Sequence, residues 1–154
     1  MGLTSTPPMP ADPPKGMIEA LGVSAHAVLR KPVRTRFDYL VEVDSEATVR
    51  AMAPDFTALK KVEARGIIVT ARADGAEFDF VSRFFAPAAG VDEDPVTGSA
   101  HCALTPYWAA LLDKLEMTAY QASARGGVVR VRLAGDRVKI GGQAVTVMTG
   151  ELKA

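Results

Sequence analysis

The 154-residue sequence is poor in cysteine and has no excess of either charge. Its single cysteine, Cys102, excludes an intramolecular disulfide and a metal cluster built on cysteine ligands. The 18 basic and 18 acidic side chains cancel, so the net charge gives no support for binding to nucleic acid or to an anionic membrane. We expect no metal and no other cofactor.

Long apolar runs are lacking as well. No stretch approaches the roughly 20 residues that a membrane-spanning helix needs. The first 15 residues contain no apolar segment of the kind found in signal peptides. The sequence therefore predicts a cytoplasmic protein with no membrane partner. A hydrophobic content of 48% and a charged content of 23% are ordinary for a globular domain.

Proline is unevenly distributed, because five of the ten residues from Thr6 to Lys15 are proline. Such a stretch is expected to be extended and to have no core of its own. We therefore expect a proline-rich arm or linker over residues 1–15. A single domain is expected over residues 16–154, a length that can bury a core of its own.

Hydrophobic periodicity predicts the elements of that domain. Short helices are expected over residues 16–22, 46–52 and 54–62. Strands are expected over residues 37–43, 67–71, 78–85, 116–123, 129–133, 137–140 and 144–148. The last three strands follow one another closely, which is typical of an antiparallel meander.

One further helix dominates the pattern. It is expected to begin near Thr97–Gly98, and its residues from Ala100 to Leu112 are almost all apolar. A helix that is apolar all round is buried on every side. Pro106 should kink it or remove one of its hydrogen bonds. Strands precede and follow this helix, so we expect an α+β fold in which an antiparallel, barrel-like sheet wraps around one central buried helix.

The start of this helix carries the main chemical signal. Either Asp94 or Thr97 can cap it through a side-chain oxygen. The unpaired backbone N–H groups at such a helix start form an anion site, and Gly98 allows a ligand to approach the backbone. Asp94 is then a candidate general acid or base. The alternative is a capped core helix behind an acidic surface turn, and caps are commoner than active sites.

The sequence around this helix also resembles a known family. Arg83-Phe-Phe-Ala-Pro87 and Glu93-Asp-Pro-Val-Thr-Gly-Ser-Ala-His101 are similar to the second domain of the PhzF-like (phenazine-biosynthesis-like) isomerases. These proteins have the diaminopimelate epimerase-like fold, and the resemblance covers about Lys15 to Leu152. Family members carry two homologous domains with the active site in the cleft between them. The resemblance implies that this chain corresponds to the second domain only.

The resemblance also implies roles for single residues. Asp94 stands where family members place an acidic residue facing the substrate, so it is the implied catalytic residue. Gly98, Ser99 and Ala100 fall where the family contacts a substrate carboxylate through hydroxyl and backbone N–H groups. The implied substrate-binding residues are Thr97, Gly98, Ser99, Ala100 and His101.

Two of the neighbouring side chains have alternative interpretations. His101 lies one turn into the apolar helix, where a core histidine is at least as common as a ligand-binding one. Cys102 lies in the apolar run and is expected to be a packed, inert thiol. Diaminopimelate epimerases use cysteines at helix starts, but the turn at residues 94–98 has none. This difference argues against cysteine-based racemisation.

Family catalysis also needs a carboxylate from the first domain, and no segment of this chain resembles that motif. The main hypothesis is an isomerase or epimerase domain that uses acid/base proton transfer on a small carboxylate-bearing substrate. Another domain or subunit would supply part of the site, either a second copy in a homodimer or a separate first-domain protein. By itself the half is expected to be inactive. A catalytically silent carboxylate-binding module and a structural assembly domain remain as alternatives.

Overall fold

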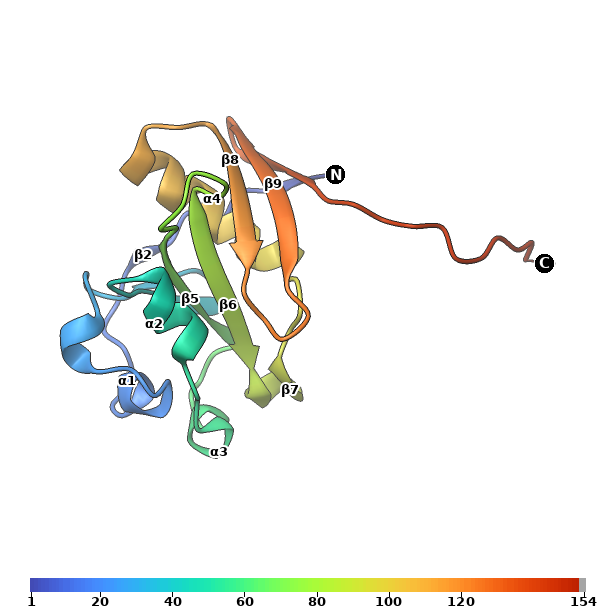
Figure 1. Cartoon of the computed structure of the whole chain (residues 1–154). Coiled ribbons are helices and arrows are strands. Elements are labelled where there is room, and N and C mark those ends of the chain that lie inside the picture. The colour runs from blue at the N-terminus through green and yellow to red at the C-terminus, as the bar shows by residue number, and fades with distance from the viewer. Residues whose placement is uncertain (153–154) are drawn as a thin grey trace.

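A computed structural model describes residues 1–152 and shows an α+β fold built on one curled sheet (Figure 1). The helices are short except for the last, and two 3₁₀ turns cover Ala25–Ala27 and Pro87–Ala89. The helices are α1 (Met17–Ala20), α2 (Glu46–Ala51), α3 (Phe56–Leu59) and α4 (Gly98–Leu112). The strands are β1 (Gly2–Thr4), β2 (Met9–Pro10), β3 (Val33–Arg34), β4 (Asp38–Glu42), β5 (Gly66–Arg72), β6 (Phe80–Ala86), β7 (Val91–Glu93), β8 (Glu116–Gln121), β9 (Gly127–Ala134) and β10 (Arg137–Gly141).

The sheet is mixed, so the expectation of an antiparallel sheet was wrong. Its strand order is β1-β10-β9-β8-β6-β5-β4-β3-β2, and β7 pairs with β6 beside this path. Two neighbouring pairs, β4 with β5 and β6 with β8, run parallel. Each of these pairs is joined by a connection that contains helices, as parallel strands require. The meander of β8, β9 and β10 is antiparallel, as the sequence predicted.

The two faces of the sheet bury separate cores. Helices α1, α2 and α3 cover one face, where the core includes Leu21, Val49 and Phe85. Helix α4 packs on the other face against residues such as Phe80 and Ile68. The sequence pattern predicted one helix inside a wrapping sheet, but the structure places helices on both sides of it. Strands β4, β5 and β6 are buried along nearly their whole length because both of their faces are covered.

Helix α4 is buried over eight of its fifteen residues. The expected burial on every side was too strong, because Ala110 and Leu111 in the last turn are exposed. Pro106 has no N–H to donate to the carbonyl group of Cys102 four residues earlier. The backbone N–H of Thr6 donates to that carbonyl instead, at 3.0 Å. The missing bond in the helix is thus replaced by one from the N-terminal arm.

The N-terminal arm is extended, as predicted, and it is also paired with the sheet. β1 pairs with β10, and β2 pairs with β3 at the opposite end of the strand order. Between these strands the chain crosses α4 at the Thr6 contact (Figure 1). The arm therefore joins both ends of the strand order across the helix.

The strand predicted over residues 144–148 does not form. Val145, Val147 and Met148 are exposed, and the segment leads away from the sheet (Figure 1). A hairpin after Gly141 would have to pair with the free edge of β10. β1 occupies that edge, with Gly2 opposite Lys139.

None of the helices within residues 1–152 is long and apolar enough to span a bilayer.

Candidate functional site

The acidic turn that precedes α4 is held against the end of β6. After the 3₁₀ turn at Pro87–Ala89, β7 folds back and pairs with β6, with an irregularity in register at Phe85 and Ala86. The N–H of Asp94 then donates to the carbonyl of Phe84 at 3.0 Å. This fold-back brings Asp94 directly to the start of α4.

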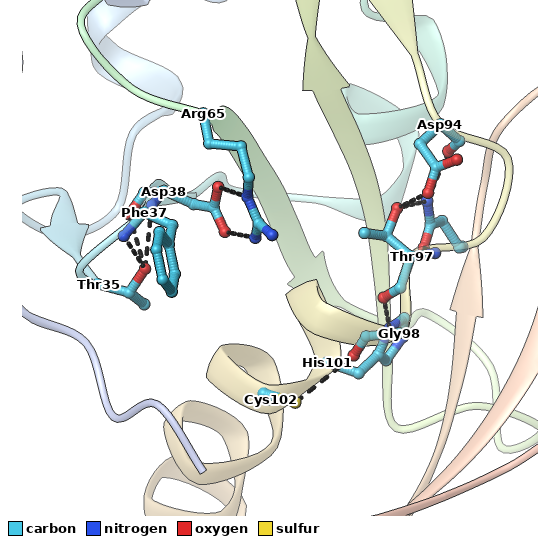
Figure 2. A network of polar contacts seen from close by, with 10 residues as sticks. Thr35, Phe37, Asp38, Arg65, Asp94, Thr97, Gly98, His101 and Cys102 are labelled. Carbon is cyan, nitrogen blue, oxygen red and sulfur yellow. Dashed lines mark hydrogen bonds and ion pairs between the residues drawn. The ribbon is translucent and has the colours of Figure 1, made fainter. Parts of the chain in front are cut away.

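Asp94 and Thr97 interact with each other at this point (Figure 2). The hydroxyl of Thr97 donates a short hydrogen bond to a carboxylate oxygen of Asp94. Neither side chain caps the helix, so the predicted side-chain cap was wrong. The Thr97 hydroxyl is turned toward the carboxylate, and it does not accept from the helix N–H groups. Within residues 1–152, no hydrogen bond from the N–H groups of Gly98, Ser99 or Ala100 is present.

This arrangement suits a bound anion. The first N–H groups of a 15-residue helix are left without an intramolecular acceptor. Ser99 is exposed and Gly98 is partly exposed, whereas Thr97 and Ala100 are buried. The predicted residues are therefore brought together at one helix start, with Asp94 beside them. Of this group, Ser99 is the one that offers both a hydroxyl and an N–H group to the outside.

His101 lies deeper in the protein than a ligand at the helix start would reach. Its side chain is fully buried, and Nδ1 lies 2.8 Å from the carbonyl oxygen of Thr97. Burial lowers the pKa of His101, and the hydrogen bond to Thr97 opposes this only in part. The neutral ring thus donates from Nδ1 and supports the first turn of the helix. Its direct contact with substrate stays a prediction.

The burial of His101 predicts a pH-dependent stability. The pKa of His101 is lower in the folded chain than its usual value of 6.5. Below pH 6.5 the imidazole is therefore protonated in the unfolded chain before it is protonated in the folded chain. The contribution of His101 to the free energy of unfolding is complete above pH 6.5. It decreases as the pH falls, at a rate approaching about 1.4 kcal/mol per pH unit. We expect His101→Asn, whose amide can replace the Nδ1 donor, to remove this component from urea unfolding curves recorded between pH 7 and 5.

The exposed His26 provides the matched control for this experiment. His26→Asn should leave the pH dependence of the unfolding free energy as it is in the original chain. An equal loss of stability on acidification in the His101→Asn protein and in the original chain would contradict the assignment.

A buried glutamine that the sequence did not single out completes this region. The side chain of Gln121, at the end of β8, is only 1% exposed. Its amide makes hydrogen bonds to both Asp94 and Thr97. A lone glutamine 27 residues beyond the acidic turn carries no local signal of such a contact.

A second polar group lies across from the helix start in Figure 2. Arg65 makes two hydrogen bonds to the carboxylate of Asp38, which is 2% exposed. Burial raises the pKa of the Cys102 thiol, while the charge of Arg65 lowers it. The net raised pKa agrees with the predicted inert thiol. Residues 1–152 contain no group of three or more side chains suited to hold a metal ion.

Other carboxylates have partners elsewhere. Glu42 accepts hydrogen bonds from Arg30 and from the hydroxyl of Tyr107. The pKa of Tyr107 is raised, mainly by burial and to a smaller extent by its interactions with Glu42. Glu93 is paired with Arg83. Asp94 is therefore the carboxylate of this region that is hydrogen-bonded to the start of α4.

A groove of about 820 Å³ reaches the helix start at Val96 and Gly98. It continues past Arg125, in the turn before β9, and along β9 from Gly127. Gly127 makes the close packing possible, because a Cβ atom at this position would overlap the side chain of Val96. Asp94 and Ser99 do not line this groove. The helix start is therefore an open surface beside a groove, and it is not the floor of an enclosed pocket.

The comparisons with known proteins point to one family. The family model described as phenazine biosynthesis-like protein (PhzC-PhzF) matches residues 19–150. An uncharacterised isomerase of Halalkalibacterium halodurans is 51% identical over 139 residues, which cover 90% of this chain and 51% of that protein. An uncharacterised isomerase of Pseudomonas aeruginosa is 61% identical over 114 residues, which cover 74% of this chain and 43% of that protein.

The solved structures agree with this relationship. A crystal structure of a PhzF family protein of Enterococcus faecalis superimposes with a TM-score of 0.87 at 36% sequence identity. The match covers all of this chain and 57% of that protein. The chain thus spans about half the length of the curated relatives it matches.

Proposed function

Because the chain belongs to the phenazine biosynthesis-like (PhzC-PhzF) family, we propose that it is the carboxylate-binding half of an isomerase active site. In this proposal Asp94 transfers a proton to or from a small substrate that bears a carboxylate. Another domain or subunit supplies the second protonatable group. The relatives named as isomerases support the reaction class.

The observation that carries the proposal is the arrangement of Asp94 at the start of α4. Its carboxylate accepts from the Thr97 hydroxyl, while the first N–H groups of the helix have no protein acceptor within residues 1–152. A substrate carboxylate bound to Gly98, Ser99 and Ala100 would be attracted by the positive end of the helix dipole. It would also bring the rest of the substrate close to Asp94.

The chemistry requires two groups. One removes a proton from a substrate carbon, and the other returns a proton to a different carbon or to the opposite face, so that no atom is gained or lost. Both must lie within hydrogen-bonding reach of the substrate. The open surface around the helix start leaves room for a facing domain that carries the second group. We propose that Asp94 is one of the two.

The same proposal extends to the full site and its setting. We propose that this chain has the diaminopimelate epimerase-like fold, as the sequence resemblance implies. The expected place of action remains the cytoplasm. A catalytically silent carboxylate-binding module remains the alternative, and the single carboxylate bonded to the helix start is the observation that favours it.

Carboxylate binding at the helix start is the first test. We expect amino-acid-like and aromatic carboxylates to bind at millimolar concentration and to shift the amide NMR signals of Gly98, Ser99 and Ala100. Ser99→Pro removes one N–H group and the hydroxyl at a position in the first helical turn, where proline is tolerated. Loss of a hydrogen bond to a charged group should weaken binding about tenfold or more.

Ser99→Ala serves as the matched control because it removes the hydroxyl and keeps the N–H group. It should retain a larger part of the affinity than Ser99→Pro. If no carboxylate binds at millimolar concentration, or if Ser99→Pro leaves the affinity unchanged, the helix start is not a carboxylate site.

Self-association is the second expected property. The sequence resemblance implies that family members carry two homologous domains. We therefore expect a second copy of this chain to take the place of the facing domain through a two-fold interface. Light scattering at micromolar concentration should then give about twice the monomer mass of 16.3 kDa. A monomer at this concentration would favour a separate first-domain protein as the partner.

A further inference from the structure

We propose that Gln121 is a positioning residue for Asp94: it holds the acidic turn and the start of α4 together so that the Asp94 carboxylate has one fixed orientation. This inference rests on the proposed function, in which Asp94 transfers a proton. Nothing in the sequence motif at residues 93–101 includes this glutamine, because it comes from a distant strand.

The fold explains how Gln121 reaches the turn. β8 runs parallel to β6, and Gln121 lies opposite Ser82 in the register of the two strands. Side chains that are opposite each other in neighbouring strands point to the same face of a sheet. Phe80, two residues before Ser82, stacks on Trp108 of α4, so this is the face that α4 covers. The Gln121 side chain therefore points toward the helix.

The amide of Gln121 makes three hydrogen bonds with the turn. Its Oε1 accepts from the N–H of Thr97 at 2.8 Å. Its Nε2 donates to the carbonyl oxygen of Asp94 at 2.7 Å and to the hydroxyl oxygen of Thr97 at 3.1 Å. One buried amide thus bridges both ends of the four-residue turn.

The donors and acceptors of this cluster match in only one way. The carboxylate of Asp94, when ionised, can only accept, so the single hydroxyl hydrogen of Thr97 is directed to it. The Thr97 oxygen must then accept from Gln121. A reversed amide would place its oxygen against the Asp94 carbonyl and its NH₂ group against the Thr97 N–H. The bonds therefore fix the amide orientation and run in sequence from Gln121 to Thr97 to Asp94.

Asp94 is consequently held at three points. Its N–H is bonded to Phe84, its carbonyl to Gln121 and one carboxylate oxygen to Thr97. Within residues 1–152, its other carboxylate oxygen has no side-chain or backbone donor and remains available to a substrate. A group that transfers protons acts efficiently only when it is held close to the productive geometry. Gln121 supplies this restraint from outside the motif.

Two variants of Gln121 separate its donor and acceptor roles. Gln121→Glu keeps the size and an oxygen that accepts from the Thr97 N–H, but it loses both donated bonds. Gln121→Met keeps approximately the same volume and loses all three bonds. Gln143→Glu, at an exposed residue, is the matched control for the change of charge.

The experiment is NMR spectroscopy of the labelled full chain. In Gln121→Met, the amide of Thr97 should exchange with deuterium at least about tenfold faster than in the original chain, while the amide of Val69 in β5 reports any change in global stability. In Gln121→Glu, the Thr97 amide should stay protected, whereas the side-chain carboxyl ¹³C signal of Asp94 should shift. Gln143→Glu should change neither signal.

Thr97→Val gives a second measurement that leaves Gln121 in place. It removes the hydroxyl link and keeps the backbone bond from Thr97 N–H to Gln121. We expect the Asp94 carboxyl signal to shift and the amide at position 97 to remain protected. This variant keeps the inference testable if both Gln121 variants fail to fold.

The outcomes distinguish the positioning role from the proposed function. An Asp94 carboxyl signal that is unchanged in Gln121→Glu, or in Thr97→Val if the glutamine variants do not fold, overturns the positioning role even if carboxylates bind at the helix start. A shifted signal supports it. If the signal shifts but benzoate fails to perturb the amides of Gly98 to Ala100 in the original chain, the positioning of Asp94 stands and the carboxylate-binding function fails.

Discussion

Replacement of Asp94 by asparagine is expected to lower the rate of substrate proton exchange by about 100-fold or more, the usual contribution of a general acid or base. Asparagine has nearly the same shape and still accepts from the Thr97 hydroxyl, but it cannot take up or release a proton at neutral pH. The reaction can be followed by NMR in deuterated water as the loss of a proton signal from a candidate carboxylate.

Because another domain or subunit is proposed to supply the second protonatable group, the measurement is made both with and without a facing half. We expect exchange when the chain is mixed with the other half of a family member such as the H. halodurans isomerase, and little exchange without it. Asp92→Asn is the matched control, because Asp92 is an exposed acidic residue in β7, two residues before Asp94. Substantial exchange by the chain alone after Asp94→Asn would remove Asp94 from the mechanism.

Trp108→Ala should produce the largest loss of stability, about 3–5 kcal/mol in the free energy of unfolding. Trp108 is 2% exposed and stacks on Phe80 with ring centres 5.6 Å apart. Its indole N–H also donates to the hydroxyl of Thr70 at 3.0 Å. The substitution leaves a large cavity between α4 and the sheet and removes this bond.

Trp108→Phe separates the two contributions. The smaller ring can keep the stack on Phe80 but not the hydrogen bond to Thr70, so a smaller loss is expected. Urea unfolding should be followed by far-ultraviolet circular dichroism, because Trp108 is the only tryptophan and its fluorescence is lost in both variants. If Trp108→Ala costs less than about 1 kcal/mol, α4 does not form the core on this face.

Local patterns were sufficient for most elements. The alternation in β4 and β9 and the apolar run of α4 follow directly from periods that a single segment reveals. The start of α4 at Gly98 also agrees with the predicted start near Thr97–Gly98. The predicted residues that lie together at the helix start are those that are consecutive in the chain.

Long-range pairing was the part that the sequence did not predict. The parallel pairs β4–β5 and β6–β8 depend on which strands meet, and no single segment carries that information. The contact of Gln121 with Asp94 depends on the second of these pairs. The strand predicted over residues 144–148 failed for the same reason, because β1 from the other end of the chain takes its place beside β10.

The position of β1 has a consequence for the order of events during synthesis. Gly2 pairs with Lys139, so β1 leaves the ribosome long before the strand with which it pairs. At translation rates of about 5–20 residues per second, this delay lasts roughly 7–27 s. Until β10 has been made, the N-terminal arm can pair with the sheet only through β2. The hydrogen bond from Thr6 to the Cys102 carbonyl is then held by an arm that is anchored at one end. Closure of the sheet at β1 is therefore a late step, and a nascent chain that is stalled before β10 should be open to proteases along β1.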